Sequence, residues 1–341
     1  MTALQPTGPH LDVDAEVITQ FTWDYVQHRP QLSRLYEKGK TSQWNATTDI
    51  DWTPEVNFGE VRSAEDDPAW QMFGFMDAGP LAKYGGDDPT RRAQLRWEFQ
   101  SWMVSQFMHG EQGALVATAR LVETVPEIDA KYYAANQVAD EARHVEAYAK
   151  YLNEKLQHSY EISKPLEALL IDIMSEKRWD ITYLGMQILV EGLALAAFGL
   201  GNAMFQDPII KQVTDYVMRD EARHVAFGVL SLQGLYPEMS SAELAEREEF
   251  LLEASQLMYD RFLLEQVWER MEIPVAEGKE FAANNPLMAI FRQMLFSKIV
   301  PNLNKLGLLT PKVRELYGNL GLLQFENAPD SATEELGAAA S

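Results

Sequence analysis

The chain has 341 residues, and its 51 acidic and 29 basic side chains give a formal net charge of -22. This charge repels phosphate backbones and anionic lipid, which argues against nucleic-acid and membrane partners. The absence of cysteine excludes disulfides, thiolate nucleophiles, iron–sulfur clusters and cysteine-bound zinc within the chain. Any redox centre must therefore use oxygen and nitrogen ligands.

The first 89 residues are predicted to form an arm of short helices and loops. Residues 1–15 are expected to be disordered, and they lack the basic and apolar regions of a secretory signal. A cytoplasmic location is therefore expected. Turn signals divide the rest of the arm at Gly39, Asn45, Pro54, Gly59, Pro68 and 79–80.

From about residue 90, long helical segments fall between prolines, and strands have little room. We expect one helical domain over 90–310. The predicted helices cover 90–123, 128–157, 166–205, 207–235, 242–272 and 286–306. Residues 311–341 are expected to form a C-terminal tail, which is solvated from residue 326 onward.

Two of these helices each carry one isolated glutamate. Glu111 is the only charged residue between 99 and 119, and Glu191 is the only one between 181 and 206. Hydrophobicity all round a helix is typical of deep burial, and the glycine and glutamine residues of 181–206 argue against a membrane span. A buried carboxylate is costly unless it is protonated, paired or bound to a cation. Each glutamate therefore needs a compensating partner.

The hexapeptide Asp-Glu-Ala-Arg-His-Val occurs twice, at 140–145 and at 220–225, and its glutamate follows an isolated glutamate by 30 residues in each case. Positions i and i+3 of a helix lie close together, one turn apart, so each Glu-x-x-His pair can bind one ion. The full set matches ferritin-like dimetal bundles. The predicted metal ligands, which are also candidate catalytic residues, are Glu111, Glu141, His144, Glu191, Glu221 and His224.

Carboxylate and imidazole ligands suit iron or manganese, whereas calcium avoids histidine and structural zinc favours cysteine. The predicted cofactor is two iron ions, with manganese as the alternative at one or both positions. A lone Glu-x-x-His is common on exposed helices, but two copies at a fixed spacing of 80 residues favour a metal site. A duplication that no longer binds metal is the remaining alternative.

The paired Asp-Glu-x-Arg-His motifs resemble those of di-iron carboxylate oxygenases and oxidases of the ferritin-like superfamily. Over about 90–235 the chain looks most like the hydroxylase subunits of bacterial multicomponent monooxygenases and, more distantly, the ribonucleotide reductase small subunit. The segment QWNATTDIDW at 43–52 resembles a stretch that precedes such bundles. The resemblance implies an all-α fold, a ferritin-like four-helix bundle with two Glu…Glu-x-x-His half-sites plus additional helices.

The resemblance also implies a role for each ligand. Glu141 and Glu221 would bridge the metals, and Glu111 and Glu191 would be terminal ligands. Asp140 and Asp220 would accept hydrogen bonds from histidine N–H groups, each from the opposite helix, as metal-bound histidines usually require. Arg143 and Arg223 would hold these aspartates; the alternative is that both Asp–Arg pairs are surface ion pairs.

The chain departs from the relatives at three positions. Leu195 replaces the threonine of the monooxygenases, with Leu115 as its first-half equivalent, and Val217 replaces the extra histidine ligand of aryl-amine N-oxygenases. Hydrocarbon hydroxylation and N-oxygenation are both less favoured as a result. An enclosed pocket is nevertheless expected beside Glu111 and Leu195. Gly113, Gly192 and Gly228 would leave room for substrate or for close helix approach.

Tyr148 is a further candidate catalytic residue. It lies four residues after His144, where the ribonucleotide reductase small subunit has its radical tyrosine, and the second half has Gly228 instead. Its spacing places it near the metals, where it would either take part in redox chemistry or line the pocket. His109 is about 200 degrees from Glu111 around the helix and is expected to point elsewhere.

The resemblance implies a dioxygen-activating di-iron monooxygenase or oxidase that acts on a small apolar or aromatic substrate. No flavin or nicotinamide motif is apparent, so a separate electron-transfer protein or reductase is the expected electron donor. A homodimer is expected. The alternatives are a tyrosyl-radical or ligand-binding oxidase like the ribonucleotide reductase small subunit, and a non-catalytic iron-binding subunit.

Overall fold

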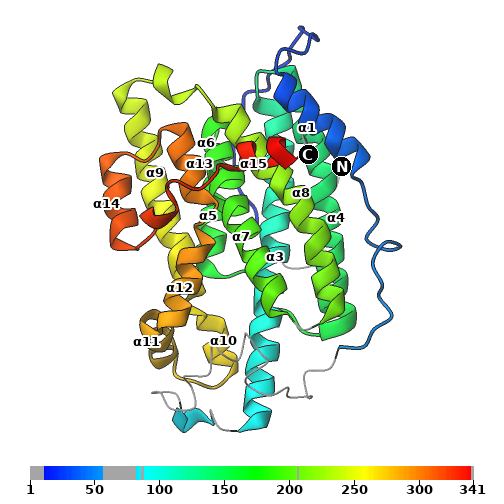
Figure 1. Ribbon diagram of the computed structural model, residues 1–341, viewed down its shortest axis with the longest axis vertical. Coiled ribbons are helices and arrows are strands. Elements are labelled where there is room, and N and C mark those ends of the chain that lie inside the picture. Colours follow the sequence, from blue (N-terminus) through cyan, green and yellow to red (C-terminus); the bar gives the residue numbers. More distant parts are fainter. Residues whose placement is uncertain (1–10, 57–81, 86–87, 206, 339–341) are drawn as a thin grey trace.

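The computed structural model describes residues 11–56, 82–85, 88–205 and 207–338. Within these ranges the chain is helical or irregular, and no strand forms (Figure 1). The predicted all-α class is confirmed. The expected disorder of residues 1–10 and the turn signals at Gly59, Pro68 and 79–80 lie outside the described residues.

Four helices form a bundle in the middle of the molecule: α3 Pro89–Thr124, α4 Ile128–Lys150, α7 Glu191–Met204 and α8 Pro208–Leu232 (Figure 1). Two of them begin at an Asp-Pro pair. Asp88 accepts a hydrogen bond from the N–H of Thr90, and Asp207 accepts one from Ile209. The proline occupies the first turn, where its missing N–H costs nothing.

This bundle is ferritin-like, as predicted. An isolated glutamate comes from each of α3 and α7, and a Glu-x-x-His pair comes from each of α4 and α8. The helices predicted over 90–123, 128–157 and 207–235 correspond to α3, to α4 with the π-helical turn η4 Tyr151–Leu156, and to α8.

The single helix predicted over 166–205 is wrong. The chain forms α5 Lys164–Ser175, α6 Trp179–Tyr183 and α7, with the π-helical turn η5 Leu184–Val190 between α6 and α7. The Glu176 carboxylate accepts hydrogen bonds from the backbone N–H groups of Lys177 at 2.8 Å and Arg178 at 2.9 Å. These local bonds replace helical ones and stabilise the break. The π-helical turn ends directly before Glu191, and such turns are frequent at functional sites.

The stretch Trp179–Met204 is the one described helical segment that is long and apolar enough to cross a membrane. Within its most apolar 18-residue window, 78% is buried inside the protein. A buried core helix passes the same test, so the segment alone is weak evidence for a membrane span.

The outer helices also break where the sequence predicts continuity. Instead of one helix over 242–272, α9 Ser241–Asp260 is followed by the 3-10 turn η7 Arg261–Leu263 and by α10 Glu265–Arg270, because Leu264 adopts a left-handed φ of 60°. Instead of one helix over 286–306, α12 Pro286–Leu295 and α13 Ile299–Leu306 flank Phe296, which is buried between the rings of Tyr259 and Tyr317.

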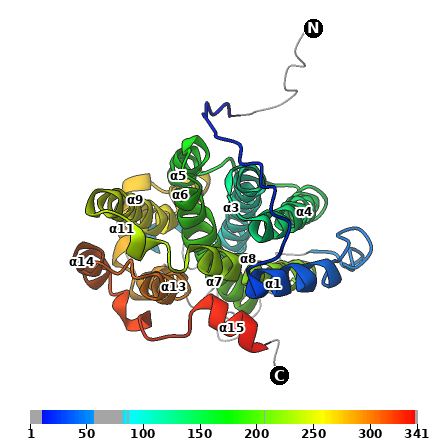
Figure 2. The same ribbon diagram turned by 90° about the horizontal axis from the view of Figure 1, so that it is seen from above.

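The C-terminal segment is not a solvated tail. It forms α14 Pro311–Asn319 and α15 Ser331–Ala338, and α15 packs against α8 (Figure 2). Asn302 Oδ1 accepts a hydrogen bond of 2.8 Å from the Ser331 N–H, which fixes the start of α15. The prediction of a solvated segment from residue 326 is therefore wrong for the described residues. The segment has few apolar side chains, but buried polar contacts dock it against the protein.

The described part of the arm also belongs to the bundle. Helix α1 Pro30–Thr41 packs across α4 and α8, where a Cβ on Gly39 would lie 2.5 Å from the Asn136 side chain. The boundaries proposed at residues 89 and 310 stay predictions. The remaining elements are α11 Val275–Asn284 and the 3-10 turns η3 Ala82–Tyr84, η6 Tyr236–Glu238 and η8 Leu323–Phe325.

The three glycines noted in the bundle serve close helix approach. A Cβ on Gly113 would lie 2.5 Å from Leu170, one on Gly228 would lie 2.5 Å from Gln187, and one on Gly192 would lie 3.2 Å from Ile299. None of these three glycines lines the cavity beside the site. They bring covering elements against the bundle instead of leaving room for a substrate.

Candidate metal centre

The six predicted ligands converge at the middle of the bundle. Each of these side chains is at most 5% exposed. Their potential ligand atoms form two groups in which all atoms lie within 4.8 Å of one another. One group is Glu111, Glu141, His144 and Glu221, and the other is Glu141, Glu191 and His224.

Two of the glutamates lie between the two histidines. Glu141 approaches His144 Nδ1 at 3.4 Å and His224 Nδ1 at 3.1 Å. Glu221 Oε1 approaches the same two nitrogens at 3.3 and 3.1 Å. Each of these carboxylates can therefore serve both metal positions, which is the bridging arrangement that the family resemblance implies.

The other two glutamates each belong to one side. Glu111 Oε2 lies 3.1 Å from His144 Nδ1, and Glu191 falls only in the group that contains His224. This arrangement is that expected of terminal ligands. Metal binding at all six residues stays a prediction, but the geometry places each of them where a ligand is required.

Within the described part of the chain, Glu141 Oε2, Glu191 Oε2 and Glu221 Oε2 are buried without a hydrogen-bond donor. Gln137 Nε2 contributes bonds of 2.9 Å to Glu141 Oε1 and 2.8 Å to Glu191 Oε1. Buried polar atoms are almost always satisfied, so orphaned carboxylate oxygens indicate a missing cation.

The electrostatics of the cluster also favour positive charge. Burial and the neighbouring Glu221 raise the pKa of Glu111 well above its ordinary value, and burial and Glu221 do the same for Glu191. Burial alone would lower the pKa of each histidine, but the carboxylates outweigh it and raise the pKa values of His144 and His224. The cluster therefore stabilises positive charge, as expected of a site that binds cations.

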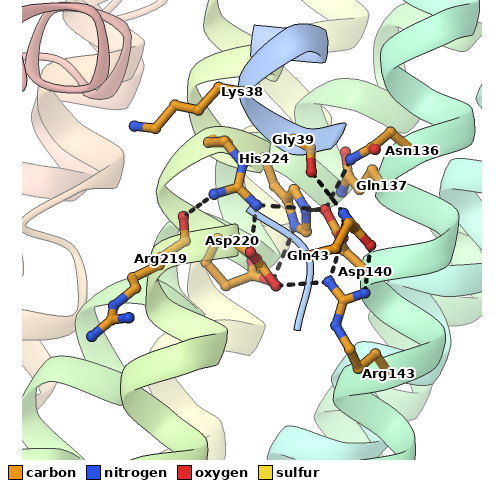
Figure 3. Close-up of polar contacts among 12 residues, drawn as sticks. Lys38, Gly39, Gln43, Asn136, Gln137, Asp140, Arg143, Arg219, Asp220 and His224 are labelled. Atoms are coloured by element: carbon orange, nitrogen blue, oxygen red, sulfur yellow. Dashed lines mark hydrogen bonds and ion pairs between the residues drawn. The ribbon is translucent and has the colours of Figure 1, made fainter. Parts of the chain in front are cut away.

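Each histidine is oriented by an aspartate from the opposite motif. His144 Nε2 lies 3.0 Å from Asp220 Oδ2. His224 Nε2 lies 3.3 Å from Asp140 Oδ2 (Figure 3). When Nε2–H donates to an aspartate, Nδ1 carries the free electron pair, and this nitrogen faces the carboxylates. The crossed pairing agrees with the expectation from the sequence.

The two aspartates share one buried polar network (Figure 3). Arg143 bonds to Asp140 and lies 3.2 Å from Asp220, while Arg223 bonds to Asp220 and lies 3.7 Å from Asp140. The side-chain exposures are 11% for Arg143 and 1% for Arg223, so the surface ion-pair alternative is wrong. The network fixes the aspartates, and the aspartates in turn fix the imidazoles.

A small cavity adjoins the centre between α3 and α7. Its free volume is about 30 Å³, and its walls include Glu111, Glu191 and Glu221 together with the aromatic rings of Phe107 and Phe198. This volume holds about two water molecules. A cavity is therefore present beside Glu111 as expected, although it is small and only partly enclosed.

Leu195 does not line this cavity, which corrects the sequence prediction. It faces an outer cleft instead, and Ala194 and Phe198 line the cavity from the same helix. The absence of a hydroxyl at Leu195 therefore has no direct bearing on the cavity. Glu191, Ala194 and Phe198 share the face of α7 that borders the cavity, whereas Leu195 lies on the face toward the outer cleft.

Tyr148 lies where its spacing places it. The ring is fully buried, with centroids 5.9 Å from Phe107 and 6.1 Å from Phe198. Burial and the nearby Glu111 carboxylate raise the pKa of its hydroxyl well above the ordinary value. His109 points away from the centre, as expected, and its Nε2 lies 2.9 Å from the Tyr160 carbonyl oxygen.

The sequence reasoning missed three residues that contact this region. Gln137 bonds two of the ligand carboxylates, and its only signal was a polar side chain one turn before Glu141. Trp44 donates a hydrogen bond of 2.8 Å from Nε1 to Asp220, and its only sequence signal was its place in the segment QWNATTDIDW. Arg261 lines the cavity from η7, and nothing in the linear sequence relates it to the motifs.

Comparison with solved structures finds R2-like ligand-binding oxidases. One, with an aerobically reconstituted metal cofactor after photoconversion, shares 15% identity at a TM-score of 0.49, covering 82% of this chain and 93% of that one. A mutant with an anaerobically reconstituted Mn/Fe cofactor shares 16% at the same score and coverage. No protein-family model and no curated protein matches the chain. Similarity at this level carries no functional argument, so the interpretation rests on the geometry of the centre.

Proposed function

We propose that this protein is a non-haem di-iron enzyme that activates dioxygen in order to oxygenate or oxidise a small organic substrate. One observation carries the proposal: Glu141 and Glu221 lie between two histidine Nδ1 atoms at 3.1–3.4 Å, and the cluster adjoins a small, largely apolar cavity. The oxygen and nitrogen ligands suit iron or manganese. When bound, a reduced metal pair supplies the electrons that dioxygen requires.

The side chains of the centre would perform three tasks. The carboxylates hold negative charge in a buried site, which favours divalent cations over protons as the pH rises. Asp140 and Asp220 keep each imidazole in the tautomer that leaves Nδ1 free. Phe107 and Phe198 wall the cavity and limit access of water to the reacting groups. A substrate would approach the centre from the side of Glu111 and Glu191.

Repeated turnover requires electrons, and we propose that a separate electron-transfer protein or reductase supplies them. The chain shows no nicotinamide or flavin motif. The Trp44 indole borders the outer cleft and bonds to Asp220, which in turn bonds to His144, so a hydrogen-bonded chain joins the cleft to the centre. A cytoplasmic location and a homodimer complete the proposal, both resting on the sequence expectations.

The experiment is to load the protein with iron(II) without oxygen, then mix it rapidly with dioxygen while recording absorbance and dioxygen uptake. The expected result is a transient absorbance and uptake of dioxygen, both lost in Glu141→Ala. Glu146→Ala is the matched control, because Glu146 is an exposed glutamate on the same helix. Bound iron without dioxygen uptake would favour a non-catalytic iron-binding subunit and would overturn the proposal.

A second candidate function is a tyrosyl-radical or ligand-binding oxidase. It is favoured by Tyr148, whose hydroxyl is fully buried close to Glu111 and His144. A radical or a side-chain crosslink should then form after exposure to dioxygen and be absent in Tyr148→Phe. Electron paramagnetic resonance and intact mass measure these two products. Unchanged dioxygen chemistry in Tyr148→Phe, with neither product in the wild type, would exclude this candidate.

A further inference from the structure

Arg261 is a buried arginine beside the candidate metal centre. It begins the turn η7 directly after α9, and only 7% of the residue is exposed. Its side chain lines the same cavity as Glu111, Glu191 and Glu221. A cationic group is therefore placed in the space from which a substrate would approach the metals.

This guanidinium has no acidic partner among the described residues. Its Nε is buried without a hydrogen bond, its NH1 group lies 3.7 Å from Met258 Sδ, and its central carbon lies 5.1 Å from the Phe262 ring centroid. Burial lowers the pKa of Arg261 to about 10, so the group stays charged at neutral pH. A buried charge without a partner is strongly unfavourable, which points to an anion that the protein itself does not supply.

Other buried arginines show how this chain normally satisfies such a group. Arg247 donates two bonds to Asp180, at 2.9 and 3.0 Å. Arg223 bonds to Asp220, and Arg292 donates to the carbonyl oxygens of Ala282 and Ala283 at 2.6 and 3.1 Å. Arg261 differs from all three, although its burial is similar.

The backbone holds Arg261 at this position at some cost. Leu264, three residues on, has a φ of 60°, which is strained for a bulky side chain. Trp268 Nε1 donates a bond of 2.7 Å to the Leu263 carbonyl oxygen, and the Trp102 ring packs edge-on against Phe262 at 5.7 Å. These contacts maintain the break between α9 and α10. Strain of this kind persists where the surrounding structure enforces it, commonly at functional sites.

We infer that Arg261 binds the carboxylate of the substrate, which makes the substrate a small organic acid with an apolar or aromatic body. The inference rests on the proposed function and narrows its substrate class. The planar guanidinium matches a carboxylate through two parallel N–H···O bonds. Because the chain is strongly acidic overall, a local cation is needed to draw an organic anion to this place.

The shape of the cavity agrees with this assignment. Its free volume of about 30 Å³ suits a carboxylate-sized group at Arg261. At Gly110, on the same wall, an added Cβ would meet no atom within 4 Å. The apolar part of the acid therefore has open space past Gly110, while Phe107 and Phe198 offer aromatic surface beside the metals.

The test measures calorimetric binding of benzoate, octanoate, benzyl alcohol and inorganic phosphate to the iron-loaded protein under nitrogen, and to the metal-free protein. The acids should bind the wild type, and the alcohol should bind at least tenfold more weakly. In Arg261→Met the affinity for the acids should fall by about 10- to 100-fold, the expected effect of losing hydrogen bonds to a charged group. Arg261→Lys should retain only part of the affinity for the acids, because lysine keeps the positive charge but lacks the two parallel N–H donors of the guanidinium.

Gly110→Leu is the second variant, since it fills the open side of the cavity and leaves Arg261 intact. It should weaken binding of octanoate more than tenfold while the protein stays folded. Equal acid affinity in wild type and Arg261→Met, or phosphate binding tighter than either acid, would overturn the inference.

The measurements distinguish failure of this inference from failure of the proposed function. A protein that takes up dioxygen but does not bind either acid contradicts the inference alone. A protein without metal or dioxygen chemistry contradicts the proposed function, while the metal-free titrations still measure whether Arg261 recognises a carboxylate.

Discussion

Helices α4 and α8 carry the same six-residue motif, yet their surroundings differ. One turn before the glutamate, α4 has Gln137, which bonds two ligand carboxylates, whereas α8 has the buried Val217. One turn after the histidine, α4 has Tyr148, whereas α8 has Gly228, against which Gln187 packs closely. The ligands are symmetric, but at these two positions only α4 supplies a polar side chain.

This difference separates two kinds of requirement. Binding two cations needs the same donors on both sides, so the six ligands are repeated at a spacing of 80 residues. Reactivity needs a directional approach and a particular set of neighbours, which a symmetric site cannot provide. The small cavity accordingly opens on the side of Glu111 and Glu191, near Tyr148.

The largest effect is expected from removing a shared ligand. Glu141→Ala on α4 and Glu221→Ala on α8 should each reduce bound iron from about two per chain to well below one, because each carboxylate serves both positions. Glu191→Ala should retain about one iron, since Glu191 belongs to one group only. Elemental analysis measures all three. A large difference between Glu141→Ala and Glu221→Ala would break the equivalence of the two helices.

The aspartates should show a smaller, graded effect. Asp140→Asn and Asp220→Asn keep the shape but lose the charge that orients each imidazole, which typically lowers metal affinity by about 10- to 100-fold. Asp220→Asn should have the larger effect, because its contact with the histidine is 3.0 Å against 3.3 Å for Asp140. Competition with a chelator measures the affinities, and the reverse order would contradict the geometry.

Exchanging the residue one helical turn before the motif glutamate tests the difference between α4 and α8 directly. Gln137→Val copies α8 onto α4 and should weaken metal binding by about tenfold, since two carboxylates lose their donor. Val217→Gln copies α4 onto α8 and should lower the free energy of unfolding by about 1–3 kcal/mol, because a larger side chain must fit into a fully buried position. Denaturant unfolding and chelator competition should show these two separate losses. If Gln137→Val binds metal as tightly as the wild type, Gln137 does not contribute to metal binding.

The smallest effects are expected one turn after the histidine. Gly228→Ala should lower the free energy of unfolding by about 1–3 kcal/mol, because its Cβ would lie 2.5 Å from Gln187. Gly110→Ala is the matched control: no atom lies within 4 Å of its Cβ, so it should be neutral or stabilise the helix by up to about 1 kcal/mol. Thermal unfolding compares the pair, and equal stability would show that the packing at Gly228 is loose.

The sequence predicts the bundle and the centre well because both depend on local patterns. Isolated glutamates in apolar helices and repeated Glu-x-x-His pairs specify which side chains face inward, and the structure brings all six together. The breaks at Glu176, Leu264 and Phe296 escape prediction, since they depend on a side-chain bond, a left-handed residue and a buried ring.

The cavity could not be predicted for a related reason. Arg261 is 150 residues from Glu111 in the chain, and only the tertiary fold brings both side chains to one cavity. Leu195 was expected there from its spacing of four residues after Glu191, but the cavity wall follows Ala194 and Phe198, three and seven residues after Glu191, while Leu195 faces the outer cleft.

The most direct test of the central claim is the anomalous X-ray scattering of iron in crystals of the iron-loaded protein. The account predicts two peaks about 3.5–4 Å apart, one beside His144 Nδ1 and one beside His224 Nδ1, with the carboxylates of Glu141 and Glu221 between them. A single peak, or iron bound away from these six residues, would contradict it.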